Sequence, residues 1–206
     1  MSERIANYLA AGEMLRRSLD LAAVGALAEA IADARDRGAT VFICGNGGSA
    51  STASHFATDL QKNTIAPGRP RIRALSLTDN GSLITAWAND ADYSRVFAEQ
   101  VLTFGRPGDL LVAISASGNS PNLLAAAEAA RSQGMTVVGL TGFSGGALRV
   151  GADIVVHVPV ESYELAEDAH LLVCHLVMSL LKAGRTAVAV AAAERVEFEP
   201  RTGASA

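Results

Sequence analysis

Apolar residues recur at helical spacing over the first part of the chain. From about residue 3 to residue 36, leucine, isoleucine and valine recur at roughly helical spacing, and alanine fills much of the space between them. Gly38 follows this segment, and glycine commonly ends a helix. The spacing predicts one long N-terminal helix over about 3–36.

Five short apolar runs follow, and helical patterns separate them. The runs span residues 40–44, 74–77, 110–115, 136–140 and 154–158. Most are continuous stretches of valine, isoleucine and leucine, which are typical of strands covered on both faces. Helices that join parallel strands form right-handed crossovers. The order of the elements therefore predicts an α/β fold, a three-layer α/β/α sandwich around a mostly parallel sheet.

The last helical pattern spans about 164–182 and is apolar on most sides from Leu171 onward. A helix of this kind is normally buried, so we expect part of it to pack against another subunit. No internal repeat and no linker divides the chain. The sequence predicts a single domain over 1–206, with a core over about 39–183 and a tail over about 184–206.

Composition narrows the class of protein. Half of the 206 residues are hydrophobic and 18% are charged, which is typical of a globular domain. The net charge of −4 argues against general binding to nucleic acid or to acidic membranes. Cys44 and Cys174 lie in apolar runs, so we expect buried free thiols. The start has no signal-peptide pattern and the most apolar stretch, 171–181, is too short to cross a bilayer, so we expect a cytoplasmic location.

The first candidate motif is a glycine-rich loop over 44–50, with the sequence CGNGGSA. It follows a predicted strand and opens a predicted helix. Glycines let the backbone turn sharply, and a helix N-terminus offers free N–H groups to an anion. The spacing is not that of the dinucleotide-binding fingerprint. A plain strand-to-helix turn remains the alternative for this loop.

The second motif is a serine-rich loop over 115–122, with the sequence SASGNSPN. It also follows a predicted buried strand, and Pro121 stands where a helix begins. The hydroxyls of Ser115, Ser117 and Ser120, together with helix-end amides, can surround a phosphate monoester. The alternative is an ordinary N-cap by Ser120, which would explain one serine but not all three.

Two pairs of histidine and carboxylate form the third candidate site. His55 and Asp59 are four positions apart on one predicted helix, so they share a face. Glu167 and His175 are eight positions apart on the late helix and can also converge. Two imidazoles and two carboxylates suit a divalent ion such as Zn²⁺. The alternative is that each histidine is an ordinary helix residue.

The remaining two histidines carry weaker signals. His170 lies on the late helix but points well away from His175, so we expect it behind the ligands or facing solvent. His157 lies inside a predicted strand, where a packing or edge position is expected.

Taken together, these motifs resemble the sugar isomerase (SIS) domain family, and most of all its bacterial phosphoheptose isomerases. The resemblance covers the chain from the N-terminal helix to about Lys182. It is carried by the segments 44–49, 55–57, 88–90, 115–120 and 140–142 and by the late helix that contains His175. It implies a flavodoxin-like core with five parallel strands. It also implies a homotetramer with active sites between subunits.

The resemblance further implies a sugar-phosphate substrate and specific roles for single residues. The serines of the second loop would hold the phosphate, and a set from the other segments would line the sugar site: Asn46, Gly47, Ser49, Asn89 and Asp90. One zinc ion per subunit would be held by His55, Asp59, Glu167 and His175. The chain departs from the family pattern at three positions, with Asp59 for a catalytic glutamate, Glu167 for a glutamine and Ala116 for a hydroxyl residue.

The implied reaction interconverts sedoheptulose 7-phosphate and D-glycero-D-manno-heptose 7-phosphate by moving a proton between C1 and C2. Either Asp59 or Glu167 would be the base, and His175 the acid. Two alternatives remain at this point. The chain could resemble the replication-initiator-associating member of the family, which binds a protein partner, or it could isomerise a different sugar phosphate.

Overall fold

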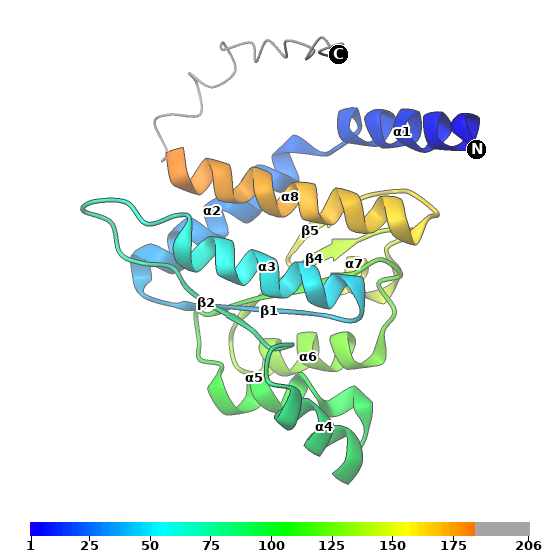
Figure 1. The fold of residues 1–206 in the computed structure, drawn as a ribbon. Coiled ribbons are helices and arrows are strands. Elements are labelled where there is room, and N and C mark those ends of the chain that lie inside the picture. Colours follow the sequence, from blue (N-terminus) through cyan, green and yellow to red (C-terminus); the bar gives the residue numbers. More distant parts are fainter. Residues whose placement is uncertain (184–206) are drawn as a thin grey trace, which may run out of the picture.

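The computed structural model describes residues 1–183, and the predicted tail over about 184–206 lies outside them. Five parallel strands form its middle layer, in the order β2-β1-β3-β4-β5 (Figure 1). Their bounds are Thr40–Gly45 (β1), Arg73–Ser76 (β2), Leu110–Ser115 (β3), Thr136–Thr141 (β4) and Ile154–His157 (β5). Every neighbouring pair is parallel. The predicted five-stranded, flavodoxin-like sheet is therefore confirmed.

Helices cover both faces of this sheet and complete the predicted three-layer sandwich (Figure 1). One face carries α2 (Leu21–Arg37), α3 (Gly48–Lys62) and α8 (Tyr163–Ala183). The other face carries α4 (Gly81–Asp90), α5 (Ala98–Phe104), α6 (Pro121–Ser132) and α7 (Gly146–Gly151). A short 3-10 turn, η1 (Tyr93–Arg95), connects α4 to α5.

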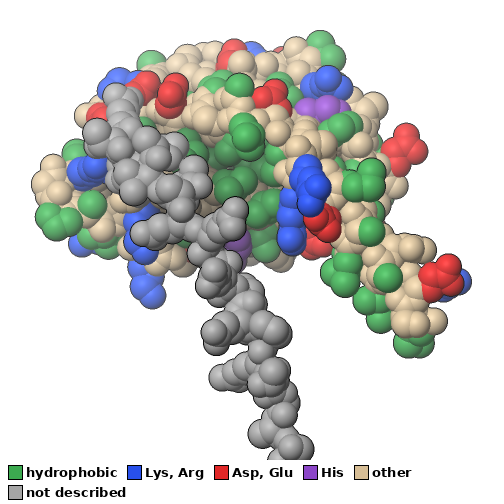
Figure 2. Space-filling model, turned by 90° about the horizontal axis from the view of Figure 1, so that it is seen from above, with side chains coloured by type: hydrophobic (Ala, Val, Ile, Leu, Met, Phe, Trp, Pro, Cys, Tyr) green, Lys and Arg blue, Asp and Glu red, His purple; other side chains and the backbone are tan. Residues whose placement is uncertain are grey.

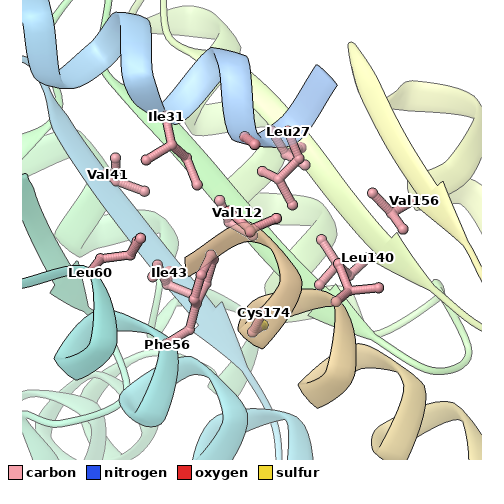
Figure 3. Packing of buried hydrophobic residues seen from close by; sticks show 14 of the residues in the cluster. Leu27, Ile31, Val41, Ile43, Phe56, Leu60, Val112, Leu140, Val156 and Cys174 are labelled. Carbon is pink, nitrogen blue, oxygen red and sulfur yellow. The ribbon is translucent and has the colours of Figure 1, made fainter. Parts of the chain in front are cut away.

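The strand β1 shows why the apolar runs are continuous. Val41 and Ile43 belong to the core formed with α2, α3 and α8, part of which Figure 3 shows. Phe42 and Cys44 belong to the separate core on the opposite face. Because successive side chains alternate between two buried faces, the four positions 41–44 are all apolar.

The predicted single N-terminal helix is wrong, because the chain breaks into two helices. The first, α1, spans Ser2–Arg17, and Asp20 then caps α2 by accepting hydrogen bonds from the backbone N–H groups of Ala22 and Ala23. A side-chain cap of this kind satisfies N–H groups that a new helix would otherwise leave free. None of the residues of α1 is buried by the described part of the chain.

Two expectations from composition can be compared with the structure. Cys44 and Cys174 are buried free thiols, as predicted. Among residues 1–183, no helix combines the length and the hydropathy needed to cross a membrane.

Candidate active site

The two predicted loops meet at the carboxyl ends of β1 and β3. These strands are neighbours in the sheet, but the chain leaves β1 for α3 on one face and leaves β3 for α6 on the other. Such a switch point leaves a crevice beyond the strand ends, where ligands of open α/β sheets bind. The sheet order therefore places both loops at the crevice.

A cavity of about 140 Å³ lies in this crevice. Its polar lining comes from the first loop, the second loop and the start of α8: Asn46, Ser49, Ser115, Ser117, Ser120, Tyr163 and Glu167. Ile114, Ala116 and Leu123 add an apolar part. The three predicted phosphate-binding serines thus share one cavity with two of the predicted sugar-binding residues.

The second loop leaves its hydroxyls directed to local amides and to the cavity. Ser115 accepts a hydrogen bond from the Gly118 N–H over 3.1 Å, and the hydroxyl of Ser117 accepts one from the Asn119 N–H over 3.3 Å. Ser120 stands at the N-cap of α6, but its side chain makes no capping bond to the described residues. An ordinary N-cap therefore does not explain Ser120, and its hydroxyl remains available to a ligand.

Gly118 is required by the packing of this loop. Its φ is +67°, and a Cβ added there would overlap the carbonyl oxygen of Gly145. The neighbouring segment braces the loop through two backbone bonds, from the Gly142 N–H to the Ala116 carbonyl and from the Leu148 N–H to the Gly118 carbonyl, each 2.9 Å long. The serine loop is therefore held from behind by the residues that follow β4.

Two side-chain amides connect the first loop to α6. Asn46 donates to the Asn122 carbonyl oxygen over 2.9 Å, and Asn122 donates back to the Asn46 carbonyl oxygen over 2.8 Å. Tyr93 also donates to the Asn46 carbonyl oxygen over 3.3 Å. Sequence reasoning gave no role to Asn122 or Tyr93. The signal available in the sequence was that Asn122 is the second asparagine of the serine motif. In the structure Asn122 is only 2% exposed.

A second cluster lies on α3 and α8, where His55, Asp59 and His175 offer ligand atoms within 4.8 Å of one another. The two histidine Nε2 atoms are 3.1 Å apart. Asp59 is only 6% exposed, and its Oδ2 makes no hydrogen bond within residues 1–183. That oxygen lies 3.3 Å from His55 Nε2 and 3.9 Å from His175 Nε2. Two imidazole nitrogens around a buried oxygen without a hydrogen bond fit a divalent ion of the zinc type.

The predicted fourth ligand, Glu167, is not brought to this cluster. A Cβ added at Gly48 would overlap the Glu167 carboxylate, so this carboxylate packs directly on the first turn of α3. The N-terminus of a helix carries a partial positive charge and favours an anion there. Glu167 therefore belongs to the cavity at the strand ends, and the group of residues that could hold a metal ion consists of His55, Asp59 and His175.

Other predicted residues lie apart from the cavity. Asn89 and Asp90 are exposed at the end of α4, where the Asn89 amide donates to the Asp90 carboxylate over 2.8 Å. Gly47, the N-cap residue of α3, is exposed and is not among the residues that line the cavity.

Of the two places expected for His170, the solvent-facing one is wrong, whereas a place behind the ligands stays a prediction. His170 is fully buried. Burial lowers the pKa of His170 to about 4. His157 does lie on the edge strand β5, half-buried, with Nδ1 3.1 Å from the Thr141 hydroxyl.

Comparison with known proteins supports the same picture. The SIS domain family model matches residues 8–142. The chain is 42% identical over 177 residues to the phosphoheptose isomerase of Alteromonas mediterranea, across 84% of this chain and 86% of that protein. It is 45% identical over 172 residues to the lincomycin biosynthesis protein LmbN of Streptomyces lincolnensis, across 78% of this chain and 62% of that protein.

A solved structure agrees over most of the fold. The phosphoheptose isomerase of Neisseria gonorrhoeae superposes with a TM-score of 0.83 and 31% identity, across 89% of this chain and 99% of that one. The similarity therefore extends well beyond the two loops.

Proposed function

The chain belongs to the SIS domain family, among its phosphoheptose isomerases, and we propose that it interconverts sedoheptulose 7-phosphate and D-glycero-D-manno-heptose 7-phosphate. Proteins with this name act on a sugar phosphate, and two relatives of that kind resemble this chain over most of its length. The similarity supports an aldose–ketose isomerase, and the site supports the choice of a long-chain sugar phosphate.

The observation that carries the proposal is the arrangement of the two clusters along α3 and α8. Gly48 contacts Glu167 at one end, and His55 lies beside His175 further along, so the two helices run in the same direction (Figure 1). On α3, His55 lies seven positions after Gly48, and on α8, His175 lies eight positions after Glu167. At about 1.5 Å per residue, the two clusters are roughly 10–12 Å apart along the helices. An extended seven-carbon chain with its phosphate at one end can span such a separation.

The phosphate end of the substrate is assigned to the serine loop. Ser115, Ser117 and Ser120 offer hydroxyls beside the N-terminus of α6, where free backbone N–H groups favour an anion. Asn46 and Ser49 line the same cavity and would bind the sugar hydroxyls that follow. Binding the remote phosphate fixes the reacting carbons in place, which lowers the entropic cost of the reaction.

The other end of the substrate is assigned to the cluster of His55, Asp59 and His175, which would hold one Zn²⁺. A bound divalent ion supplies positive charge that stabilises the oxyanion at C1 or C2 during isomerisation. Asp59 contributes the negative charge and the histidines the neutral nitrogens that zinc prefers. The choice of zinc as the ion is supported by the ligand types, two imidazoles and one carboxylate, and by the family resemblance.

The proton transfer between C1 and C2 needs a base at the end of the site that would hold these two carbons. Glu167 stands in the cavity with the phosphate-binding serines, roughly 10–12 Å along the helices from the three-residue cluster. Asp59 Oδ2 faces the two histidine nitrogens at the other end, so we assign the base to Asp59. His175 lies at the same end and would serve as the acid. The base then keeps the position of the family's glutamate, with a side chain one methylene shorter.

An isomerase of another sugar phosphate is the second candidate. Its support is the similarity to LmbN, a protein named for lincomycin biosynthesis, together with the substitutions at 59 and 167. The cavity and the metal cluster would be used in the same way. Only the length and the hydroxyl pattern of the sugar would differ.

We also propose that the protein is a homotetramer. We propose a cytoplasmic location too, as expected from the sequence. The support is α1, which none of the described residues buries and which exposes more than half of Ile5, Leu9 and Met14. Figure 2 shows hydrophobic side chains along α1, which projects from the body at the lower right of that view. A second copy of the chain would remove these side chains from water.

A substrate panel tests the proposed function. Purified protein with Zn²⁺ would be incubated separately with sedoheptulose 7-phosphate and with ketose phosphates of five, six and eight carbons, and the aldose products separated by chromatography. We expect turnover to be highest for the seven-carbon substrate. A clear preference for another length would favour the second candidate, and no product from any substrate would contradict an isomerase.

A further inference from the structure

We propose that Asn63 is a positioning residue for the metal cluster: its side-chain amide holds the Asp59 carboxylate so that one oxygen faces the two histidines. The inference rests on the proposed function, because it assumes that His55, Asp59 and His175 hold a divalent ion.

Asn63 and Asp59 are joined by two hydrogen bonds at the end of α3. Asn63 Nδ2 donates to Asp59 Oδ1 over 2.7 Å. The backbone N–H of Asn63 donates to the Asp59 carbonyl over 2.8 Å, and Asn63 is the C-cap residue of the helix. The backbone bond fixes where the Asn63 side chain begins, and the amide then reaches back by one turn to the carboxylate.

This contact makes the two carboxylate oxygens of Asp59 different. Oδ1 is held by the amide, whereas Oδ2 is buried, makes no hydrogen bond within residues 1–183, and lies 3.3 Å from His55 Nε2. The terminal torsion of an aspartate is otherwise soft, so an unsupported carboxylate could turn either oxygen toward the histidines. Because the Asn63 amide already holds the Asp59 carboxylate in one orientation, the carboxylate would lose less conformational freedom when an ion binds.

The type of donor matters as well as its position. The Asn63 amide is neutral, so the Asp59 carboxylate keeps its full charge for the ion. A lysine or arginine in the same place would offset that charge. Asp59 is also one methylene shorter than glutamate, which leaves it less freedom to adjust its reach. Hydrogen bonds that orient metal-binding carboxylates typically contribute about 10- to 100-fold in metal affinity.

Zinc affinity tests this inference directly. The dissociation constant for Zn²⁺ would be measured by competition with a chromophoric chelator for wild type, Asn63→Ala and Gln133→Ala. Gln133 is the matched control, because it places an amide side chain at the C-cap of α6. We expect Asn63→Ala to weaken zinc binding about 10-fold or more and Gln133→Ala to leave it unchanged. Melting temperatures of the metal-free proteins would be recorded alongside.

The outcomes separate the inference from the function on which it rests. If wild type binds Zn²⁺ and Asn63→Ala binds it equally well, the positioning role is wrong, even if the metal-free variant melts at a lower temperature. A lower melting temperature alone would assign Asn63 to helix stability only. If wild type binds no Zn²⁺, the metal assignment of the proposed function fails, and the role of Asn63 fails with it.

Discussion

The Nε2 atoms of His55 and His175 lie 3.1 Å apart, although 120 positions separate the two residues in the chain. Two neutral imidazoles can share such a contact only if one nitrogen donates and the other accepts, and two protonated rings would repel each other. A shared divalent ion removes this restriction, because it binds the lone pairs of both nitrogens. The contact thus brings together groups from α3 and α8 in a form suited to an ion.

Removing either histidine should therefore release the metal. We expect wild-type protein purified without chelator to contain up to about one zinc per chain, and His55→Ala and His175→Ala to contain little, because each loses one of three ligands. His157→Ala is the matched control, since His157 lies on the edge strand outside the cluster. Elemental analysis provides the measurement. Equal zinc content in all four proteins would show that the ion, if present, binds elsewhere.

The serine loop should bind the phosphate of the substrate. Replacing Ser115, Ser117 and Ser120 together by alanine removes three hydroxyls from the cavity. Hydrogen bonds to charged groups contribute about 1.5–3 kcal/mol each, so we expect sugar-phosphate affinity to fall by at least about 100-fold. Isothermal titration calorimetry measures the affinity, and the melting temperature reports whether the fold is intact. Ser132→Ala, at the far end of α6, is the control, and an unchanged affinity in the triple variant would remove the phosphate assignment.

Glu167→Gln tests which carboxylate is the base. The variant keeps the size of the side chain but loses its charge and its ability to accept a proton. Because Glu167 lies at the phosphate end of the site, we expect zinc content and turnover to stay near the wild-type level. Phosphate affinity should be equal or tighter, because a negative charge has left the cavity. In contrast, Asp59→Asn should lose both the metal and turnover. A fall in turnover of about 10²- to 10⁴-fold in Glu167→Gln, at wild-type zinc content, would move the base to Glu167.

The strands and the two loops could be predicted because their patterns are local. A strand between two helical layers is apolar along its central positions on both faces, and a ligand loop at a strand end needs glycines and serines in a short stretch. The break before α2 was also encoded, by Asp20, but the apolar period continues across it and hides the cap.

The direction of Glu167 could not be predicted from spacing alone. Its position relative to His175 allows convergence around the helix axis, but side chains on a helix tilt toward its N-terminus. The helix α8 also lies beside α3, so Glu167 reaches Gly48 and not the histidines. The pairing of Asn46 with Asn122 likewise depends on the order of β1 and β3 in the sheet, which single-residue patterns do not reveal.

The buried His170 should make the protein sensitive to acid. Burial lowers its pKa to about 4, from an ordinary value of 6.5. Between these two values the unfolded chain binds a proton that the folded protein does not, so stability falls as the pH drops from 6.5 to 4. The expected loss of unfolding free energy is about 3 kcal/mol. Urea unfolding of wild type and His170→Leu across this range measures it, and equal slopes in both proteins would contradict the assignment.

The most direct test of the account is an NMR measurement of the reaction itself. Zinc-loaded protein would be mixed with sedoheptulose 7-phosphate in D₂O, with His175→Ala as the inactive control. Because the proton passes through a base that exchanges with solvent, we expect the aldose heptose 7-phosphate to appear with deuterium at C2, in wild type only. Binding of sedoheptulose 7-phosphate without any aldose product, from protein shown to contain its metal, would contradict the proposed isomerase.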